Sequence, residues 1–355
     1  MTNLQRIQAA LPEAGLDAIL LREAKNRYYA TGFRSSAGMA VVTEHEAFFV
    51  TDSRYIEAAR HRIRGCTVGE SSMTMRERDW LEQILRDCGV TMLGFEEESI
   101  TYADFERLRR ETDAVLTPAQ SVLKTLRAVK SPEEQAKMRA AQALAEQVLD
   151  EILGLLRPGL TEKEVAAEIT YRLLRHGAEG NSFDPIVVTG KNSSMPHGVP
   201  GDTPIRNGDF VTMDFGCVLD GYCSDMTRTV AVGAPTAEMR AVYDVVLRAQ
   251  AAGIAAFRAG VSGRTVDAAG RKVIEDAGYG AYFGHSFGHS LGLDIHESPS
   301  ASPSETGALP AGAVVSAEPG IYLPGKFGVR IEDVVIVTET GCEDITKAPK
   351  DLLIL

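Results

Sequence analysis

The chain has 355 residues, of which 44% are hydrophobic and 24% charged, a composition typical of a globular protein with about two domains. Its formal net charge of −12 argues against nucleic acid or an anionic membrane as the main partner, and no apolar stretch reaches the roughly 18–20 residues of a membrane span. The odd number of cysteines, five without a CxxC pair, and the lack of a signal-peptide pattern at the N-terminus predict reduced thiols and a cytoplasmic location.

Residues 1–116 alternate between helical and strand patterns. Amphipathic spacing predicts helices over residues 4–15, 52–62 and 75–89. Short apolar runs predict strands at DAILL (17–21), GMAVVTEH (38–45) and EAFFVTD (46–52). Such alternation is typical of a small three-layer α/β domain. We interpret residues 117–131 as a connecting segment, which places a domain boundary near residue 125 and divides the chain into residues 1–125 and 126–355.

Two helix starts after this boundary carry the same signal. Ser131 and Glu134 form a capping box, in which each side chain accepts from the backbone N–H of the other residue, and a proline occupies the first helical position. Thr161 and Glu164 repeat the box at a second helix, which we expect to end before Gly177.

The second part of the chain contains an internal duplication, visible in segments that share glycine and apolar positions. The aligned segments are RPGLTEKEV (157–165) with RAGVSGRTV (258–266), and NGDFVTMDFG (207–216) with AGAVVSAEPG (311–320). In this alignment Asp214 coincides with Glu318, and farther along Asp225 coincides with Glu332. Four carboxylates thus occur as two related pairs and need positive charge between them. The pattern points to a metal site and an enzyme.

The first acidic pair, Asp214 and Asp225, lies in two β-rich segments that are expected to form a hairpin. A turn centred on Leu219–Asp220 would place the two acids directly opposite each other, whereas a turn on Asp220–Gly221 would make them diagonal neighbours. Both registers put them on one face of the sheet, within about 4.5–8 Å. Carboxylates that close repel, and burial raises the pKa of one unless a cation intervenes. The alternative is that one of them is only a turn residue.

The second pair is Glu318, at the end of a strand and before a Pro-Gly turn, and Glu332, within the apolar segment GVRIEDVVIV. A carboxylate in a buried strand is costly unless it is paired or binds a metal. Arg330 is expected on the same face as Glu332. A buried Arg330–Glu332 ion pair without a metal is therefore the alternative interpretation.

Three of the seven histidines, His285, His289 and His296, lie in GHSFGHSLGLDIHESP. Its regularly spaced glycines argue against a helix, and on a strand His285 and His289 would face the same side. That arrangement suits one metal ligand and one substrate contact. His197, in the loop NSSMPHG, lies in the corresponding segment of the other repeat.

Two divalent cations would balance the four carboxylates, and Arg330 would balance a hydroxide that bridges them. Oxygen ligands with one imidazole favour Mn, Fe, Co or Zn over a metal selected by thiolates. Two such ions about 3.5–4 Å apart form a hydrolytic site. We therefore expect two divalent metal ions, Mn first, with Zn or Co as alternatives.

The motifs VTMDFG, YCSDMTRT, FGHSFGHSLGLDIHE, SAEPGIY and GVRIED together resemble the pita-bread metallopeptidases. NRYYATGF and TDSRY resemble the creatinase-type N-terminal domain of their Xaa-Pro branch, which comprises aminopeptidase P and prolidase. The resemblance implies an α+β protein in which residues 126–355 form a pita-bread (creatinase/aminopeptidase) domain with internal pseudo-twofold duplication, preceded by a smaller three-layer α/β domain in residues 1–125. By analogy, the first domain forms a homodimer and covers the partner's active site.

The resemblance also implies roles for individual residues. The family's metal ligands correspond to Asp214, Asp225, His289, Glu318 and Glu332. Family members use a bridging hydroxide as the nucleophile, and Glu318 matches the ligand that transfers protons. His285 and His296 match histidines that hold the substrate and stabilise the tetrahedral intermediate, and His197 matches another that lines the pocket. Arg330 and Tyr322 match positions beside the metals.

The predicted function is that of an Xaa-Pro aminopeptidase acting on short proline-containing peptides. The alternative is a prolidase, which accepts only Xaa-Pro dipeptides, and the difference depends on whether a cation binds the carboxylate of the proline itself. A catalytically inactive peptide-binding homologue is a remote alternative, because such a protein is expected to have lost ligands. The N-terminal domain argues against methionine aminopeptidase, and the complete ligand set argues against creatinase.

Overall fold

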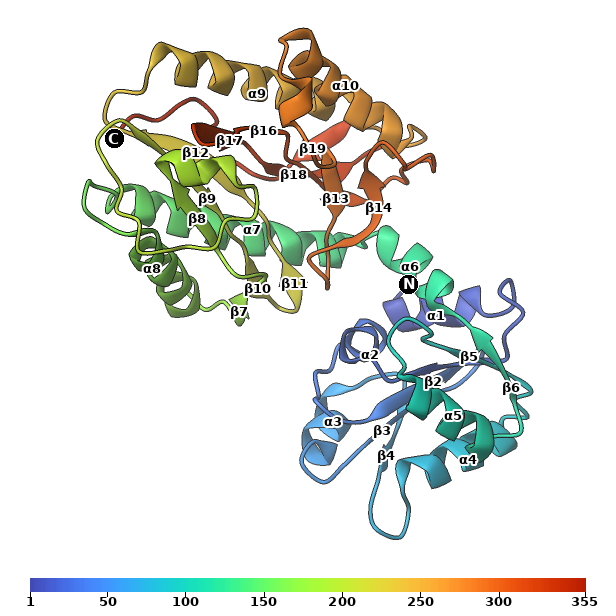
Figure 1. The fold of residues 1–355 in the computed structure, drawn as a ribbon. Helices are drawn as coiled ribbons and strands as arrows, with labels where there is room; N and C mark the ends of the chain where they lie inside the picture. Colours follow the sequence, from blue (N-terminus) through green and yellow to red (C-terminus); the bar gives the residue numbers. More distant parts are fainter. The chain divides into compact units, whose positions relative to one another are not determined.

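The computed structural model describes residues 1–355, which form two compact units, residues 1–127 and 128–355 (Figure 1). No helix in it combines the length and the apolar composition that crossing a membrane requires. All five cysteines are free, as predicted.

The first unit is built on a six-stranded sheet in the order β4-β3-β2-β1-β5-β6. The sheet is mixed, because β1 pairs antiparallel with β2 and parallel with β5. The strands are β1 (Ala18–Leu21), β2 (Met39–Thr43), β3 (Ala47–Thr51), β4 (Thr67–Glu70), β5 (Met92–Phe95) and β6 (Val115–Pro118). The helices of this part are α1 (Asn3–Ala10), α2 (Ala24–Thr31), α3 (Ile56–Arg62), α4 (Glu77–Asp87), α5 (Tyr102–Glu111) and α6 (Gln120–Ala128).

Helices cover both faces of this sheet. Leu81 and Leu85 of α4 pack in one cluster with Leu20 of β1. The neighbouring strand residues, Ile19 and Leu21, point to the opposite face and are fully buried, and α1 and α2 contact β1 and β2 there. The unit therefore has the three layers that the alternating pattern predicts.

Residues 117–131 are more than the connecting segment expected from the sequence, because α6 occupies most of them. The start of α6 is capped from a distance: Glu97 Oε2 accepts from the backbone N–H groups of Ala119 and Gln120, each at 2.9 Å. A cap supplied by a residue remote in sequence leaves no local capping signal. Leu123, on the inner face of α6, is fully buried.

The second unit contains two helix pairs, α7 (Pro132–Leu153) with α8 (Glu162–Arg175), and α9 (Ala237–Ala256) with α10 (Gly263–Asp276). Both predicted capping boxes are present before α7 and α8. The pairs match in length, with 22 and 14 residues in the first pair and 20 and 14 in the second. The helices thus repeat as the alignment of the sequence predicts.

Glycines that the alignment equates share an unusual backbone conformation. Gly177 and Gly278, after α8 and α10, have φ of 99° and 84°, and Gly208 and Gly312, which precede equivalent strands, have φ of 93° and 85°. Such values are open to glycine and strained for other residues. The same turns therefore recur in both halves.

Strands follow each helix pair. The first half forms sheets of order β12-β9-β8 and β11-β10-β7, and the second half a sheet of order β14-β13-β15-β18-β19 and the hairpin β16-β17. The first set is β7 (Gly180–Asn181), β8 (Ile186–Thr189), β9 (Asp209–Asp214), β10 (Cys217–Leu219), β11 (Tyr222–Cys223) and β12 (Thr227–Val232), with a short 3₁₀ helix η1 (Gly190–Ser194). The second is β13 (Gly288–Ser290), β14 (Glu297–Ala301), β15 (Val314–Ala317), β16 (Gly320–Leu323), β17 (Phe327–Arg330), β18 (Asp333–Val337) and β19 (Cys342–Asp344), with η2 (Gly280–Tyr282).

The hairpin that carries the first acidic pair adopts the second of the two predicted registers. Asp214 pairs with Thr227 across β9 and β12, and the pairing of β10 with β11 places the turn on Asp220–Gly221. These turn residues have φ of 46° and 81°, as a tight hairpin turn requires. Asp214 and Asp225 are therefore diagonal neighbours on the strands.

Candidate metal centre

A cavity of about 500 Å³ in the second unit is lined by residues from both halves of the duplication. The sequence-predicted residues on its wall are Asp214, Asp225, His197, His285, His289, His296, Glu318, Arg330 and Glu332. Tyr322 is not on the wall, but its hydroxyl group contacts His285 and Arg330. The structure therefore brings all ten predicted site residues into one neighbourhood.

His289 presents an unprotonated nitrogen to the acids. It lies in β13, which approaches β15 so closely that a Cβ on Gly288 would lie 1.9 Å from the Ser316 carbonyl oxygen. The Nδ1 atom of His289 is 3.2 Å from the Ser290 carbonyl oxygen, and because a carbonyl only accepts, Nδ1 carries the proton. Burial lowers the pKa of His289, so its ring is neutral and Nε2 offers a lone pair.

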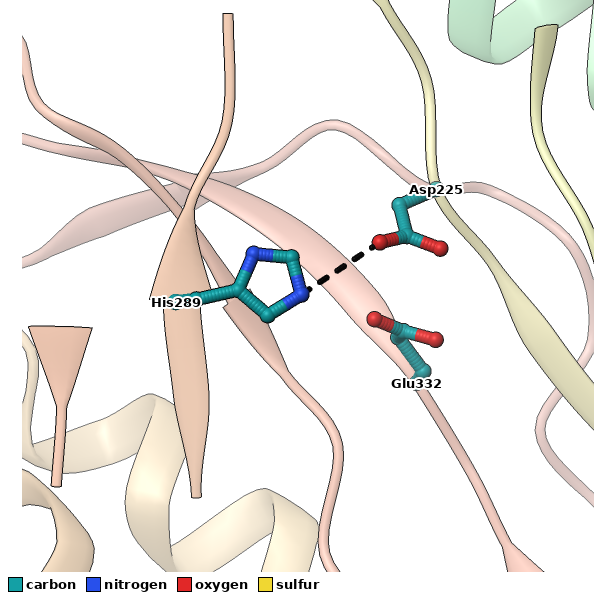
Figure 2. A group of neighbouring side chains, drawn as sticks. All are labelled: Asp225, His289 and Glu332. Carbon is teal, nitrogen blue, oxygen red and sulfur yellow. Dashed lines mark ion pairs between the residues drawn. The ribbon is translucent and has the colours of Figure 1, made fainter. Parts of the chain in front are cut away.

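That lone pair points at two carboxylates. His289 Nε2 lies 3.6 Å from Asp225 Oδ2 and 3.4 Å from Glu318 Oε1. One ligand atom each of Asp225, His289 and Glu332 lies within 4.8 Å of the other two (Figure 2). Electron-rich atoms that converge in this way favour a cation between them.

The buried acids of this site also favour a nearby positive charge. Burial, together with the nearby Asp214, raises the pKa of Asp225 well above its ordinary value, and burial together with Asp225 does the same to the pKa of Glu332. One oxygen of each of three acids is buried without a hydrogen-bond partner: Asp214 Oδ1, Asp225 Oδ1 and Glu332 Oε1. Buried polar atoms rarely lack partners in folded proteins.

These donors fit divalent metal ions. Three partnerless carboxylate oxygens with one imidazole nitrogen are ligands that Mn, Co and Zn accept. Glu318, one residue past β15, adds a further carboxylate to the same cavity. Its Oε1 accepts from Ser316 Oγ at 3.1 Å, and burial raises the pKa of Glu318. All five residues expected as ligands are thus available to hold ions.

Arg330 is the only arginine on the cavity wall, which has no lysine, and it is held from several sides. Its Nη2 lies 2.5 Å from Asp214 Oδ2, and its Nε donates to Thr227 Oγ1 at 3.0 Å. Its Nη1 donates to the Tyr322 hydroxyl at 2.9 Å and to the Pro196 carbonyl at 3.2 Å. The sequence left open an ion pair between Arg330 and Glu332, whereas in the structure Arg330 forms its ion pair with Asp214.

Tyr322 links Arg330 to His285. Since a guanidinium only donates, the Tyr322 hydroxyl accepts from Arg330 and gives its own proton to His285 Nε2 at 2.8 Å. His285 Nδ1 in turn donates to the Ser286 carbonyl at 2.8 Å. Burial lowers the pKa of His285 and raises that of Tyr322 to about 12, so both groups are neutral at pH 7. The chain of bonds fixes one imidazole orientation.

The remaining two histidines face the cavity outside the metal-binding group. His296 packs edge to face against His289, with ring centroids 4.4 Å apart. His197 lies on the loop after η1, with an exposed side chain. Both positions leave ring edges available to a molecule in the cavity.

Thr227 was not singled out from the sequence, although it lies in the SDMTRT motif. Its hydroxyl group donates to Glu332 Oε2 at 2.7 Å and accepts from Arg330 Nε. It therefore leaves Oε1 as the Glu332 oxygen without a partner. Only the tertiary structure reveals this role, because Thr227 and Glu332 are far apart in sequence.

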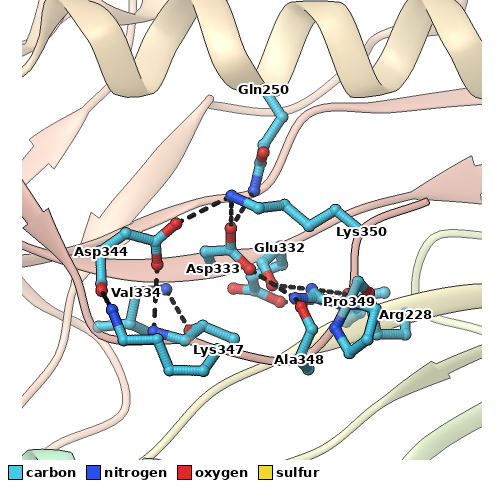
Figure 3. Close-up of polar contacts among 12 residues, drawn as sticks. Arg228, Gln250, Glu332, Asp333, Val334, Asp344, Lys347, Ala348, Pro349 and Lys350 are labelled. Atoms are coloured by element: carbon cyan, nitrogen blue, oxygen red, sulfur yellow. Dashed lines mark hydrogen bonds and ion pairs between the residues drawn. The ribbon is translucent and has the colours of Figure 1, made fainter.

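Arg228, the next residue, contacts the backbone of Glu332 (Figure 3). Its Nη1 donates to the Glu332 carbonyl oxygen at 2.6 Å, and its Nη2 donates to Asp333 Oδ1 at 2.7 Å. The same guanidinium binds the carbonyl oxygens of Ala348 and Pro349. One buried cation thus connects the Glu332 backbone with a segment near the C-terminus.

Comparison with known proteins identifies relatives over the full length. The sequence model of metallopeptidase family M24 matches residues 136–339, and that of the creatinase/prolidase N-terminal domain matches residues 3–129. An uncharacterized peptidase of Bacillus subtilis (strain 168) is 42% identical over 99% of this chain and 100% of its own.

Two solved structures are similar throughout. An Xaa-Pro dipeptidase from Bacillus anthracis has a TM-score of 0.95 and 40% identity, and the match covers 99% of both chains. An X-Pro aminopeptidase from Thermotoga maritima has a TM-score of 0.94 and 34% identity, covering 99% of this chain and 100% of the other. These similarities confirm the predicted α+β architecture, with a creatinase-type domain followed by a pita-bread domain.

Proposed function

Because the chain belongs to metallopeptidase family M24, within its Xaa-Pro branch, we propose that it is an Xaa-Pro aminopeptidase that hydrolyses the N-terminal Xaa-Pro bond of short peptides. The observation that carries this proposal is the meeting of three partnerless carboxylate oxygens with the His289 lone pair in one cavity. It supports a dinuclear metal centre held by Asp214, Asp225, His289, Glu318 and Glu332. Two divalent ions, Mn first and Zn or Co as alternatives, would supply Lewis-acid charge and lower the pKa of a water for hydrolysis.

Glu318 is the proposed proton carrier. Its carboxylate lies on the cavity wall, and burial raises its pKa, which favours uptake of a proton by this group. Ser316 Oγ binds one of its oxygens and so limits its rotation. The other oxygen remains free to face a metal or a reacting group.

Three histidines are the proposed substrate contacts. His197, His285 and His296 line the cavity. An imidazole N–H of His197 or His296 can stabilise the negative charge that develops on the peptide carbonyl oxygen, whereas both ring nitrogens of His285 are engaged by Tyr322 and Ser286, so His285 would contact the peptide through its ring edge. Tyr322 and Arg330 orient the ring of His285 through the bonds described above. In this proposal the acids hold the ions and the histidines bind the peptide.

The cavity lining supports an aminopeptidase over a prolidase. A dipeptide ending in proline presents a carboxylate, which a free cation would bind. The wall has no lysine, and four of the five N–H donors of its one arginine, Arg330, are engaged by Asp214, Thr227, Tyr322 and Pro196. A prolidase remains the alternative, because the similar structures include both an Xaa-Pro dipeptidase and an X-Pro aminopeptidase.

Two measurements test the proposal. Dialysis against a chelator should abolish hydrolysis of Ala-Pro-Ala, and Mn should restore it; full activity in metal-free protein would rule out the dinuclear centre. Comparison of Ala-Pro with Ala-Pro-Ala on the same enzyme tests the specificity. We expect faster cleavage of the tripeptide, and cleavage of the dipeptide alone would establish a prolidase.

We also propose that the protein acts in the cytoplasm as a homodimer, with residues 1–125 as the dimerisation domain and 126–355 as the catalytic domain. The five free cysteines favour a reducing compartment. Light scattering of the purified protein should give the mass of a dimer, and a monomer at every concentration would contradict this.

A further inference from the structure

His197 has no hydrogen bond of its own to hold it. Its side chain is exposed on the cavity wall, and neither ring nitrogen has a partner within the chain. The adjacent Met195 and Val199 are exposed at 48% and 85%, so little packing restrains this loop from outside. The position of the imidazole therefore depends on how the backbone of the loop is anchored.

Glu162 anchors both ends of that loop. It is the first residue of α8, is 1% exposed, and forms no ion pair. Its Oε1 accepts from the backbone N–H of Thr189 at 2.8 Å and from Asn192 Nδ2 at 3.0 Å, before the loop. Its Oε2 accepts from the backbone N–H of Gly201 at 2.9 Å, after the loop. One carboxylate thus closes the segment from 189 to 201.

The middle of the loop has a second anchor in the metal site. Arg330 Nη1 donates to the carbonyl oxygen of Pro196, the residue before His197. On the other side of His197, a Cβ added to Gly198 would lie 2.5 Å from Val188 Cγ1, so the loop lies directly against β8. Because both ends and one inner carbonyl of the loop are held, its backbone fixes where His197 lies on the cavity wall.

We propose that Glu162 is a positioning residue that places His197 for substrate binding, an inference that rests on the proposed peptidase function for its kinetic consequence. Both Glu162 oxygens must act as acceptors, since each faces a backbone N–H. Glutamine has the same shape but only one acceptor, so its amide NH₂ would face a donor and one contact at an end of the loop would be lost. The function of Glu162 is thus specific to a carboxylate.

Glu164 supplies the matched control. It lies in the same first turn of α8, is exposed, and accepts only from Thr161, so Glu164→Gln removes the same charge from the same helix end. We expect Glu162→Gln to speed amide hydrogen exchange in residues 189–201, and Glu164→Gln to leave it unchanged. This readout does not depend on any enzymatic activity.

The second test measures kcat/KM of the variants on Ala-Pro-Ala. Misplacement of a binding group by about 1 Å can cost up to about 100-fold, so we expect Glu162→Gln to lower kcat/KM at least about tenfold and Glu164→Gln less than about twofold. In a His197→Ala background, Glu162→Gln should change kcat/KM less than about twofold, because the residue through which it acts is gone.

The outcomes separate the two proposals. The positioning role would be overturned if Glu162→Gln lowered kcat/KM as much in the His197→Ala background as in the wild type, even with faster exchange. Unchanged amide exchange in residues 189–201 would overturn it as well. A wild-type protein that cleaves no Xaa-Pro peptide would refute the peptidase function, while the exchange experiment would still test the anchor. If Glu162→Gln does not fold, Asn192→Ala removes one donor of the anchor and should give a smaller effect of the same kind.

Discussion

Tyr322→Phe removes a single oxygen atom from the chain that orients His285. That oxygen makes two hydrogen bonds, 2.8 Å from His285 Nε2 and 2.9 Å from Arg330 Nη1. Arg330 Nη1 keeps a bond to the Pro196 carbonyl, so the main loss is a half-buried imidazole nitrogen without a partner. Such a loss costs about 1–3 kcal/mol.

Part of this cost should appear in catalysis, because the freed His285 ring can rotate away from its substrate-binding orientation. About 1–2 kcal/mol lost from the transition state corresponds to a drop of about 5- to 30-fold in kcat/KM. The assay is hydrolysis of Ala-Pro-Ala, with the free energy of unfolding measured on the same preparation. The metal content must equal that of the wild type.

Tyr243→Phe is the matched control. Tyr243 is also buried and donates one hydrogen bond of 2.8 Å to the Lys350 carbonyl, outside the cavity. We expect a loss of about 1 kcal/mol in stability and a change in kcat/KM below about twofold. Equal effects of the two substitutions on kcat/KM would refute the reasoning, because Tyr322 would then act through stability alone.

Two further predictions concern the acids. Glu318→Gln should lower kcat by about 100-fold or more, as expected for loss of a general acid–base group. Glu339→Gln, a change at an exposed residue outside the cavity, should leave kcat unchanged. Near-normal turnover of Glu318→Gln would remove Glu318 from the mechanism. In chelated protein, the raised pKa values of Asp225 and Glu332 mean that the folded state binds more protons than the unfolded chain, so the melting temperature should fall as pH rises above about 4. Added Mn should raise it more at pH 8 than at pH 5, and a shift independent of pH would contradict the assignment.

Local signals in the sequence were sufficient for several features of the second unit. The capping boxes depend on residues only a few positions apart, and so does the Asp220–Gly221 turn, which was one of two turns that the sequence left open. The aligned glycines of positive φ follow from the internal repeat. Because the turn sets the hairpin register, it also places Asp214 and Asp225 as neighbours. The remaining acids and the histidines were joined to this pair by the internal repeat and by the resemblance to the metallopeptidases, which supplied the complete ligand set.

Features that depend on contacts between distant segments were missed. The cap of α6 comes from Glu97, and the hydroxyl that binds Glu332 comes from Thr227. Arg228 and Glu162 look like ordinary charged residues on a strand and a helix, and only their burial reveals their roles. A sequence pattern reports which face a residue occupies, but it does not report the partner that meets it there.

The division of the five proposed metal ligands between the two halves has a consequence for the lifetime of the folded protein. Asp214 and Asp225 belong to the first half, and His289, Glu318 and Glu332 to the second. An ion bound by both would act as a non-covalent cross-link between distant segments, comparable to a disulfide but available to a chain whose cysteines are all free. Unfolding would then have to wait for the ion to leave, so slow metal release would make the enzyme kinetically stable.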